Sequence, residues 1–223
     1  MITDIRIADF IESFDEPLSN CMKEMERYAE ENYVPIIKKP TRTLMRFLLH
    51  MHKPMQILEV GTAIGFSAIY MSQFLQEGAH ITTIEKVPAR IRDAKDNIKK
   101  NKKEDVITLL EGDATEVLEM LKNEGKTFDF IFMDAAKGQY LNFFPTVEAL
   151  LKKDGLLVSD NVLQDGDVVE SRYAVTRRNR TIHMRMRDYL YTLTHTDTLD
   201  TVILPLGDGV TLSTKIEENR LEK

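Results

Sequence analysis

The strongest constraint on the fold is a regular alternation between short apolar runs and amphipathic segments. Apolar, β-rich runs recur at 56–60, 80–85, 106–111, 128–134 and 156–159. Apolar residues at helical spacing fill the stretches between them, at 66–77, 87–101, 114–124 and 139–152. Strands that are apolar throughout, separated by helices, predict a parallel sheet covered by helices on both faces.

The two ends of the chain depart from this alternation. Residues 5–33 carry apolar side chains at helical spacing, and Pro17 is expected to divide them into two helices. Residues 41–50 read as a third helix. Near the other end, two β-rich runs flank Gly207-Asp208-Gly209, which predicts a hairpin. We expect one α/β domain over residues 1–223, with a helical extension at 1–40 and a core at 41–223.

Composition excludes several classes of protein. Cys21 is the only cysteine, so neither an intrachain disulfide nor a thiolate metal cluster can form. The net charge of −6 argues against a surface devoted as a whole to nucleic acid. The first residues lack the apolar segment of a signal peptide, and no run approaches the roughly 18 apolar residues that span a bilayer. We therefore expect a soluble, cytoplasmic protein with no membrane partner.

The most specific local motif joins the first strand to the helix that follows it. It reads Glu59-Val60-Gly61-Thr62-Ala63-Ile64-Gly65-Phe66-Ser67. Glycines at such a turn let the backbone bend tightly and approach a ligand closely. The motif departs from the dinucleotide fingerprint G-x-G-x-x-G, because Thr62 and Ala63 stand where a second glycine is needed. A pyrophosphate ligand is therefore disfavoured, and the motif alone could be an ordinary βα turn.

Two further strand ends carry groups suited to a nucleoside. Glu85 ends the second strand, where a carboxylate can accept both ribose hydroxyls. Gly112-Asp113-Ala114 ends the third strand, where Asp113 can accept from an adenine amino group and the small Ala114 leaves room for the ring. Each acid alone could be an ordinary strand-end residue. Together they line the carboxyl edge of the sheet, where parallel sheets bind ligands.

The fourth and fifth strands end in oxygen-bearing side chains. Asp134 ends the fourth strand, and Asp160-Asn161 follows the fifth. Two carboxylates and an amide suit a hard cation such as Mg²⁺ better than zinc. Either acid alone would be assigned as a helix cap or a loop anchor. The three residues together predict a divalent metal site.

An arginine-rich segment follows the predicted metal ligands and should border the mouth of the site. Residues 172–187 contain no acid and carry Arg172, Arg177, Arg178, Arg180, Arg185 and Arg187. Arginines at this density suit phosphate contacts, so we predict RNA binding by the first four. The alternative is a solvated helix face. Lys38, Lys39, Arg42 and Arg46 would extend the basic patch. Because the chain lacks Trp, a base would stack on Tyr or Phe, with Tyr140 and Tyr173 as candidates.

These motifs resemble the metal-dependent O-methyltransferases of the catechol and caffeoyl-CoA type. The resemblance covers roughly residues 35–214 and rests on Glu59-x-Gly61-Thr62, Glu85, Gly112-Asp113-Ala114, Met133-Asp134-Ala135-Ala136-Lys137, Asp160-Asn161-Val162-Leu163 and Gly207-Asp208-Gly209. It implies a Rossmann-like class I methyltransferase fold, with a mainly parallel seven-stranded sheet, an antiparallel C-terminal strand and helices on both faces.

The resemblance also implies the ligands. S-adenosylmethionine would contact Ile37, Glu59, Gly61, Thr62, Ser67, Glu85, Asp113, Ala114 and Asp134. Mg²⁺ would be held by Asp134, Asp160 and Asn161 and would lower the pKa of the acceptor hydroxyl. Lys137 would stand beside the acceptor oxygen and, with Asp134, would be catalytic. The family resemblance favours a homodimer, in which the N-terminal helices could pair.

The chain as a whole resembles the bacterial branch of this family that methylates 5-hydroxyuridine at position 34, the wobble position of tRNA, to 5-methoxyuridine. That hydroxyl has a neighbouring carbonyl, so it could chelate a metal as a catechol does. A base of the anticodon loop can be splayed into a pocket. The alternative acceptor is a small catechol or phenol. A dehydrogenase-like nucleotide-binding protein and a catalytically silent interaction module are the other hypotheses.

Overall fold

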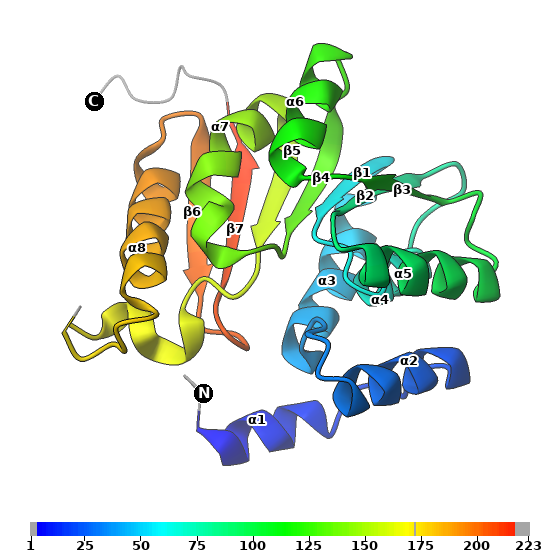
Figure 1. Ribbon diagram of the computed structural model, residues 1–223, viewed down its shortest axis with the longest axis horizontal. Helices are drawn as coiled ribbons and strands as arrows, with labels where there is room; N and C mark the ends of the chain where they lie inside the picture. Colours follow the sequence, from blue (N-terminus) through cyan, green and yellow to red (C-terminus); the bar gives the residue numbers. More distant parts are fainter. Residues whose placement is uncertain (1–3, 172, 217–223) are drawn as a thin grey trace. The chain divides into compact units, whose positions relative to one another are not determined.

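The computed structural model describes residues 4–171 and 173–216. They form two compact units: an amino-terminal unit, Asp4–Val117, and a carboxy-terminal unit that begins at Leu118. Each unit has its own strands and helices (Figure 1). Among the described helices, none combines the length and apolar character needed to cross a membrane. The single domain expected over residues 1–223 stays a prediction.

The amino-terminal unit begins with three helices. They are α1 (Ile5–Glu12), α2 (Asn20–Glu31) and α3 (Lys39–His52). The side chain of Ser19 caps α2 by accepting from the backbone N–H of Met22, and a proline opens α3. The predicted break between the first two helices is confirmed, because Pro17 lies between them. The buried face of α2 consists of Met22, Met25 and Ala29.

Three parallel strands follow, in the order β3-β2-β1. The elements are β1 (Gln56–Val60), α4 (Phe66–Met71), β2 (His80–Glu85), α5 (Pro88–Lys100) and β3 (Ile107–Glu111). The register pairs Val60 with Ile84 and Glu85 with Glu111, so the strand ends meet at one edge. Helix α6 (Ala114–Asn123) runs across the boundary between the two units.

The carboxy-terminal unit contains four strands in the order β4-β5-β7-β6. Its elements are β4 (Phe128–Met133), η1 (Lys137–Gln139), α7 (Tyr140–Leu150), β5 (Leu151–Ser159), η2 (Gln164–Val169), α8 (Arg180–His195), β6 (Leu199–Leu204) and β7 (Val210–Lys215). β4 and β5 are parallel, whereas β7 is antiparallel to both β5 and β6. The predicted C-terminal hairpin is therefore confirmed.

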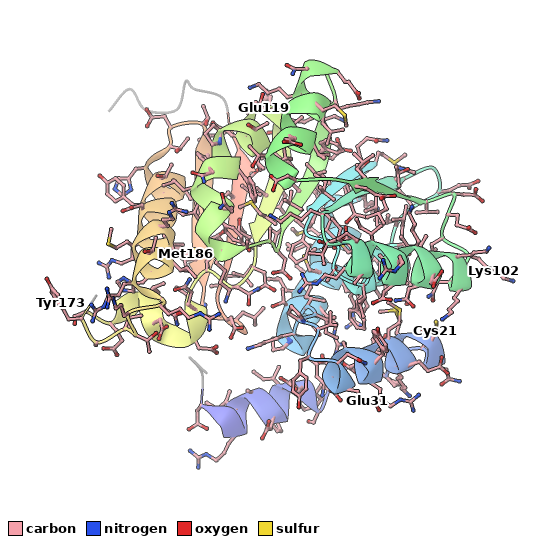
Figure 2. The ribbon with its side chains drawn as sticks, viewed as in Figure 1. Cys21, Glu31, Lys102, Glu119, Tyr173 and Met186 are labelled. Atoms are coloured by element: carbon pink, nitrogen blue, oxygen red, sulfur yellow. The ribbon has the colours of Figure 1, made fainter. Side chains whose placement is uncertain are left out.

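A helix in the arginine-rich segment was expected only as the alternative to an RNA-binding segment, and with a solvated face; the structure has α8 there. It contacts α7, η1, η2 and β6, and Figure 1 shows it alongside β6. Its buried face consists of His183, Met186, Tyr189 and Leu193, among which Met186 points into the unit (Figure 2). Arginines interrupt these apolar positions in the sequence and conceal the helical period. Strand β5 also starts five residues earlier than predicted, because Leu151 directly follows α7 and polar residues then precede the apolar run.

Candidate active site

The turn after β1 adopts the strained backbone that its glycines allow. Gly61 and Gly65 have φ of +107° and +82°, and Ala63 between them has φ of +47°. The backbone N–H groups of Gly61 and Thr62 donate to the carbonyl of Ile84 at 3.2 and 3.1 Å. The turn is thereby fixed to the end of β2, and the close approach of its backbone to a ligand stays a prediction.

Glu85 holds this turn from the neighbouring strand end. Its carboxylate accepts from the backbone N–H of Ala63 at Oε2, and from those of Lys86 and Val87 at Oε1, each at 2.9 Å. The side chain is buried, with 7% of the residue exposed. A carboxylate has about four lone-pair sites, so Oε2 can accept one more donor without displacing a backbone bond. One ribose hydroxyl can therefore be accommodated, and the predicted contact with both would displace one of these bonds.

A buried chain of polar groups lies beneath the turn. Thr83 Oγ1 donates to Glu59 Oε2 at 2.5 Å, and the hydroxyls of Thr62 and Thr83 lie 2.6 Å apart. Because the Thr83 hydroxyl has a single proton, Thr62 must be the donor in that pair. Glu59 is fully buried, so it supports the turn through the two threonines. Its direct contact with a cofactor stays a prediction.

Four of the other predicted cofactor residues lie in the same unit, whereas Asp134 belongs to the carboxy-terminal unit. Ile37 and Ser67 are buried, and Ala114 begins α6. Asp113 caps α6 by accepting from the backbone N–H of Thr115 at 3.0 Å, and it pairs with Lys86 at 3.1 Å. These two contacts, the helix cap first, lower the pKa of Asp113. Asp113 is therefore a charged acceptor at the strand end, with a capping role of its own.

The predicted metal ligands converge in the carboxy-terminal unit. The side-chain amide of Asn161 donates to Asp134 Oδ1 at 2.8 Å, and its backbone N–H donates to Asp160 Oδ1 at 2.8 Å. Asn161 itself has φ of +62°, which turns the chain sharply after β5. The ends of two parallel neighbours thus bring all three side chains together, as the sequence predicted.

Negative charge accumulates at this point. The pKa of Asp160 is raised to about 7, mainly by burial and next by the negative charge of the adjacent Asp134. Burial likewise raises the pKa of Asp134, and Asp208 acts in the same direction on both acids. The positive charge of Lys137, which is half-buried in η1, opposes these shifts. Crowded, desolvated carboxylates of this kind fit a divalent cation.

The donor set centres on two carboxylates, a number that is ordinary for Mg²⁺. Among the residues that the structure describes, no group of three or more His, Cys, Asp and Glu side chains is arranged to hold a metal ion. A cation here would rest on Asp134, Asp160 and the oxygen of Asn161. These oxygen donors suit Mg²⁺ rather than zinc, and the identity of the metal stays a prediction.

Asp208 is the central residue of the Gly207-Asp208-Gly209 motif, and the sequence assigned it no role in the site. It is buried, and its carbonyl accepts from the N–H of Leu163 at 2.8 Å, while the carbonyl of Gly209 accepts from Val162 at 3.0 Å. The hairpin turn thereby holds the loop that begins at Asn161. The sequence predicted the turn at Gly207-Asp208-Gly209 but did not predict that the turn would hold this loop.

The arginine-rich segment divides into two kinds of residue. Arg185 donates to the carbonyl of Gly138 at 2.8 Å and Arg187 to that of Val168 at 2.8 Å, so both join α8 to neighbouring segments. Arg177 and Arg178 are exposed and, within the described part of the chain, have no recorded hydrogen bond or ion pair. Arg172 lies outside the described residues.

The two stacking candidates differ completely in exposure. Tyr173 is 83% exposed and projects outward from the loop before α8 (Figure 2), with the guanidinium of Arg180 5.8 Å from its ring centre. Arg180 also donates to the carbonyl of Val175 at 3.3 Å. Tyr140 is fully buried, so its candidacy as a stacking residue is wrong.

The proposed extension of the basic patch is wrong at Arg42, and two of its other members form ion pairs. Arg42 is buried and pairs with Glu26 at 2.7 Å, and Arg46 pairs with Glu16 at 2.9 Å. Lys39 lies 3.7 Å from Glu12. Acids of the first two helices and the segment between them neutralise these cations, which periodicity alone could not reveal.

Comparison with known proteins adds a family to this geometry. The family model described as O-methyltransferase matches residues 12–216. A catechol O-methyltransferase of Niastella koreensis is 32% identical over 169 residues, covering 75% of this chain and 75% of its own length. Caffeoyl-CoA O-methyltransferase 2 of Populus trichocarpa is 29% identical over 206 residues, covering 88% and 82%.

Solved structures agree with these relatives. A Staphylococcus aureus protein, provisionally named a caffeoyl-CoA O-methyltransferase, superposes with a TM-score of 0.86 at 33% identity, covering 95% of this chain and all of its own. An O-methyltransferase of Bacillus cereus in complex with SAH has a TM-score of 0.83 at 21% identity, covering 94% and 97%, and shows the fold alone. The predicted Rossmann-like α/β methyltransferase fold, mostly parallel with antiparallel C-terminal strands, is confirmed.

Proposed function

Because this chain belongs to the O-methyltransferase family and is an S-adenosylmethionine-dependent enzyme of the caffeoyl-CoA and catechol type, we propose that it uses Mg²⁺ to methylate 5-hydroxyuridine at wobble position 34 of tRNA, giving 5-methoxyuridine. The observation that carries the choice of tRNA is the pair of exposed arginines, Arg177 and Arg178, in the unit that holds the metal ligands. The anticodon loop would be the partner, and the cytoplasm the place of reaction.

The arginine segment is joined to the chemical residues by a direct contact. Arg185 of α8 donates to the carbonyl of Gly138, the residue after Lys137. Helix α8 therefore places the loop that carries Arg177 and Arg178 within the same packed group of elements as η1. Two exposed guanidinium groups that bond to none of the described residues favour a polyanionic substrate, since they can contact phosphates without breaking a bond to the described part of the chain.

The chain's own residues supply binding, orientation and proton transfer. The turn at Gly61–Gly65, with Glu85 and Asp113, would hold the methyl donor, and Asp134 would contact it as well. Asp134, Asp160 and Asn161 would hold Mg²⁺, which lowers the pKa of the acceptor hydroxyl and fixes its oxygen. Lys137 would stand beside that oxygen and take part in removing its proton. The exposed ring of Tyr173 offers a surface on which an unstacked base can lie.

The decisive experiment is methyl transfer to tRNA that carries 5-hydroxyuridine, with S-adenosylmethionine and Mg²⁺ supplied. Replacing Arg177 and Arg178 together by Ala should raise the KM for tRNA about ten-fold and reduce the slope of log KM against log salt by about 2. The matched control replaces Lys99 and Lys100, two exposed cations at the end of α5, and should change neither quantity. Unmodified nucleoside after prolonged reaction would overturn the tRNA assignment.

A small catechol or phenol is the alternative acceptor. It is favoured by the names of the relatives, a catechol O-methyltransferase and caffeoyl-CoA O-methyltransferases. This alternative predicts rapid methylation of free catechol, with little dependence on salt and no loss of rate in the Arg177/Arg178 variant. The same variants therefore distinguish the two acceptors.

We further propose a homodimer that involves α1. Its apolar side chains are exposed: Ile7 by 54%, Phe10 by 66%, Ile11 by 58% and the following Phe14 by 72%. A contiguous apolar helix face of this kind is costly to leave in water and favours association. Arg6 at the start of the helix pairs instead with its N-cap residue, Asp4, at 3.1 Å.

A further inference from the structure

The hydroxyl of Tyr140 lies between the ends of β4 and β5, the two strands that the predicted metal ligands follow. It donates to the carbonyl of Asp160 at 3.0 Å and to the carbonyl of Met133 at 3.1 Å. Met133 immediately precedes Asp134, and Asp160 immediately precedes Asn161. Because a phenol has one proton, the two carbonyls share it in a three-centre bond. A single side chain therefore contacts the backbone beside every predicted metal ligand.

The backbone at this point needs such a donor. The carbonyl of Met133 already accepts from the N–H of Asp160 at 3.0 Å, which continues the ladder between β4 and β5. The chain then leaves the sheet at Asn161, whose φ is +62°. Asp160, the residue before this turn, is buried, and its carbonyl accepts from the Tyr140 hydroxyl. Tyr140 satisfies it and fixes its direction.

Packing holds the Tyr140 ring rigidly in place. Tyr140 and Tyr189 are both fully buried, and their rings meet edge to face with centroids 5.4 Å apart. The hydroxyl of Tyr189 lies 2.7 Å from Ser159 Oγ, next to Asp160. Tyr189 thus bonds a side chain. Tyr140 instead bonds the backbone of Asp160, a predicted ligand, and of Met133, the residue before Asp134. This difference provides a matched comparison between two buried tyrosine hydroxyls.

From these contacts we propose that Tyr140 is a positioning residue for the metal site. Its hydroxyl sets the separation and direction of the two strand ends so that Asp134, Asp160 and Asn161 can share one divalent cation. The inference rests on the metal site of the proposed function and adds to it a residue that contacts neither cofactor nor acceptor. Groups that orient metal ligands in this way typically contribute ten- to hundred-fold to affinity.

The test is binding of Mn²⁺ alone, followed by the paramagnetic resonance signal of the free ion. Tyr140→Phe keeps the ring and its contact with Tyr189 but removes the shared proton, so the Kd for Mn²⁺ should rise about ten-fold or more. Tyr189→Phe should leave that Kd within about two-fold of the wild type. In the methylation assay, Tyr140→Phe should require a higher Mg²⁺ concentration for half-maximal rate and should recover most of kcat at saturating Mg²⁺.

Each outcome distinguishes the two proposals. If the wild type binds Mn²⁺ and Tyr140→Phe binds it equally well, the positioning role is wrong while the metal site stands. An equal loss in Tyr189→Phe would also overturn the positioning role, because the effect would then belong to loosening of the core. If the wild type binds no Mn²⁺, or if Asp160→Ala binds it as well as the wild type does, the proposed metal site is wrong. The positioning role is then wrong as well. Thermal unfolding of each variant verifies that it is folded.

Discussion

Replacing Gly209 by Ala adds only one methyl group, but it is expected to lower the stability of the carboxy-terminal unit substantially. Gly209 has φ of +88°, and an added Cβ would lie 2.3 Å from Leu163 Cγ, 2.5 Å from its Cβ and 2.7 Å from its backbone nitrogen. Left-handed backbone costs an alanine about 1 kcal/mol, and overpacking of a well-packed site costs about 1–3 kcal/mol. The sum is about 2–4 kcal/mol.

Gly125 supplies the matched control in the same unit. It has φ of +69°, but an added Cβ would meet nothing within 4 Å. Gly125→Ala should therefore show the backbone cost alone, about 1 kcal/mol. For a chain of this size, 1 kcal/mol lowers Tm by about 2–4 °C, so we expect about 2–4 °C for Gly125→Ala and about 4–16 °C for Gly209→Ala.

Calorimetry or circular dichroism on the two purified variants measures this difference. A second readout is Mn²⁺ binding, which should weaken in Gly209→Ala because Leu163 donates to Asp208 and Val162 to Gly209, so that the clash displaces the loop after Asn161. Equal Tm losses in the two variants would refute the reasoning. That result would mean that Leu163 moves aside without cost.

Three further outcomes follow from the site and the first helix. The folded-state pKa of Asp160 is raised from 3.8 to about 7, so its contribution makes the metal-free protein less stable as pH rises through that range. The stability of Asp160→Asn should therefore depend less on pH between about 4 and 7, measured as denaturant midpoints, and an unchanged pH dependence would contradict the assignment. Lys137→Met should lower kcat about 100-fold or more with little change in the Kd for S-adenosylmethionine, measured calorimetrically; full activity would exclude Lys137 from proton transfer. Phe10→Asp should shift the protein from dimer to monomer in sedimentation experiments, whereas Arg6→Asp, which leaves the apolar side chains of α1 in place, should not.

The sequence predicted best those features that have a strong period or sit at a strand end. β1 and β2 match their predicted bounds of 56–60 and 80–85, because both are apolar runs closed by a glycine or an acid. The convergence of Asp134 with Asn161 followed from one rule, that neighbouring parallel strands end at the same edge. Such features depend on local pattern and topology, which a sequence carries directly.

What the sequence could not provide depends on which side chains meet. Tyr140 and Tyr173 look alike in the sequence, yet one is fully buried and the other is 83% exposed. Arg42 was counted with a basic patch because nothing local reveals that Glu26, sixteen residues earlier, neutralises it. The buried face of α8 was not predicted because arginines alternate with its buried residues, and long side chains of this kind can lie along an apolar surface.

The three backbone bonds accepted by Glu85 have a consequence for the thermodynamics of ligand binding. They fix the turn at Ala63 and the segment at Lys86 and Val87 before any ligand arrives. The conformational entropy of these segments is therefore lost during folding and is not lost again on association. A nucleoside ligand should bind here with a small entropy penalty and with rates close to those of a rigid receptor. Substitution of Glu85 would then change the flexibility of the free protein as well as its affinity.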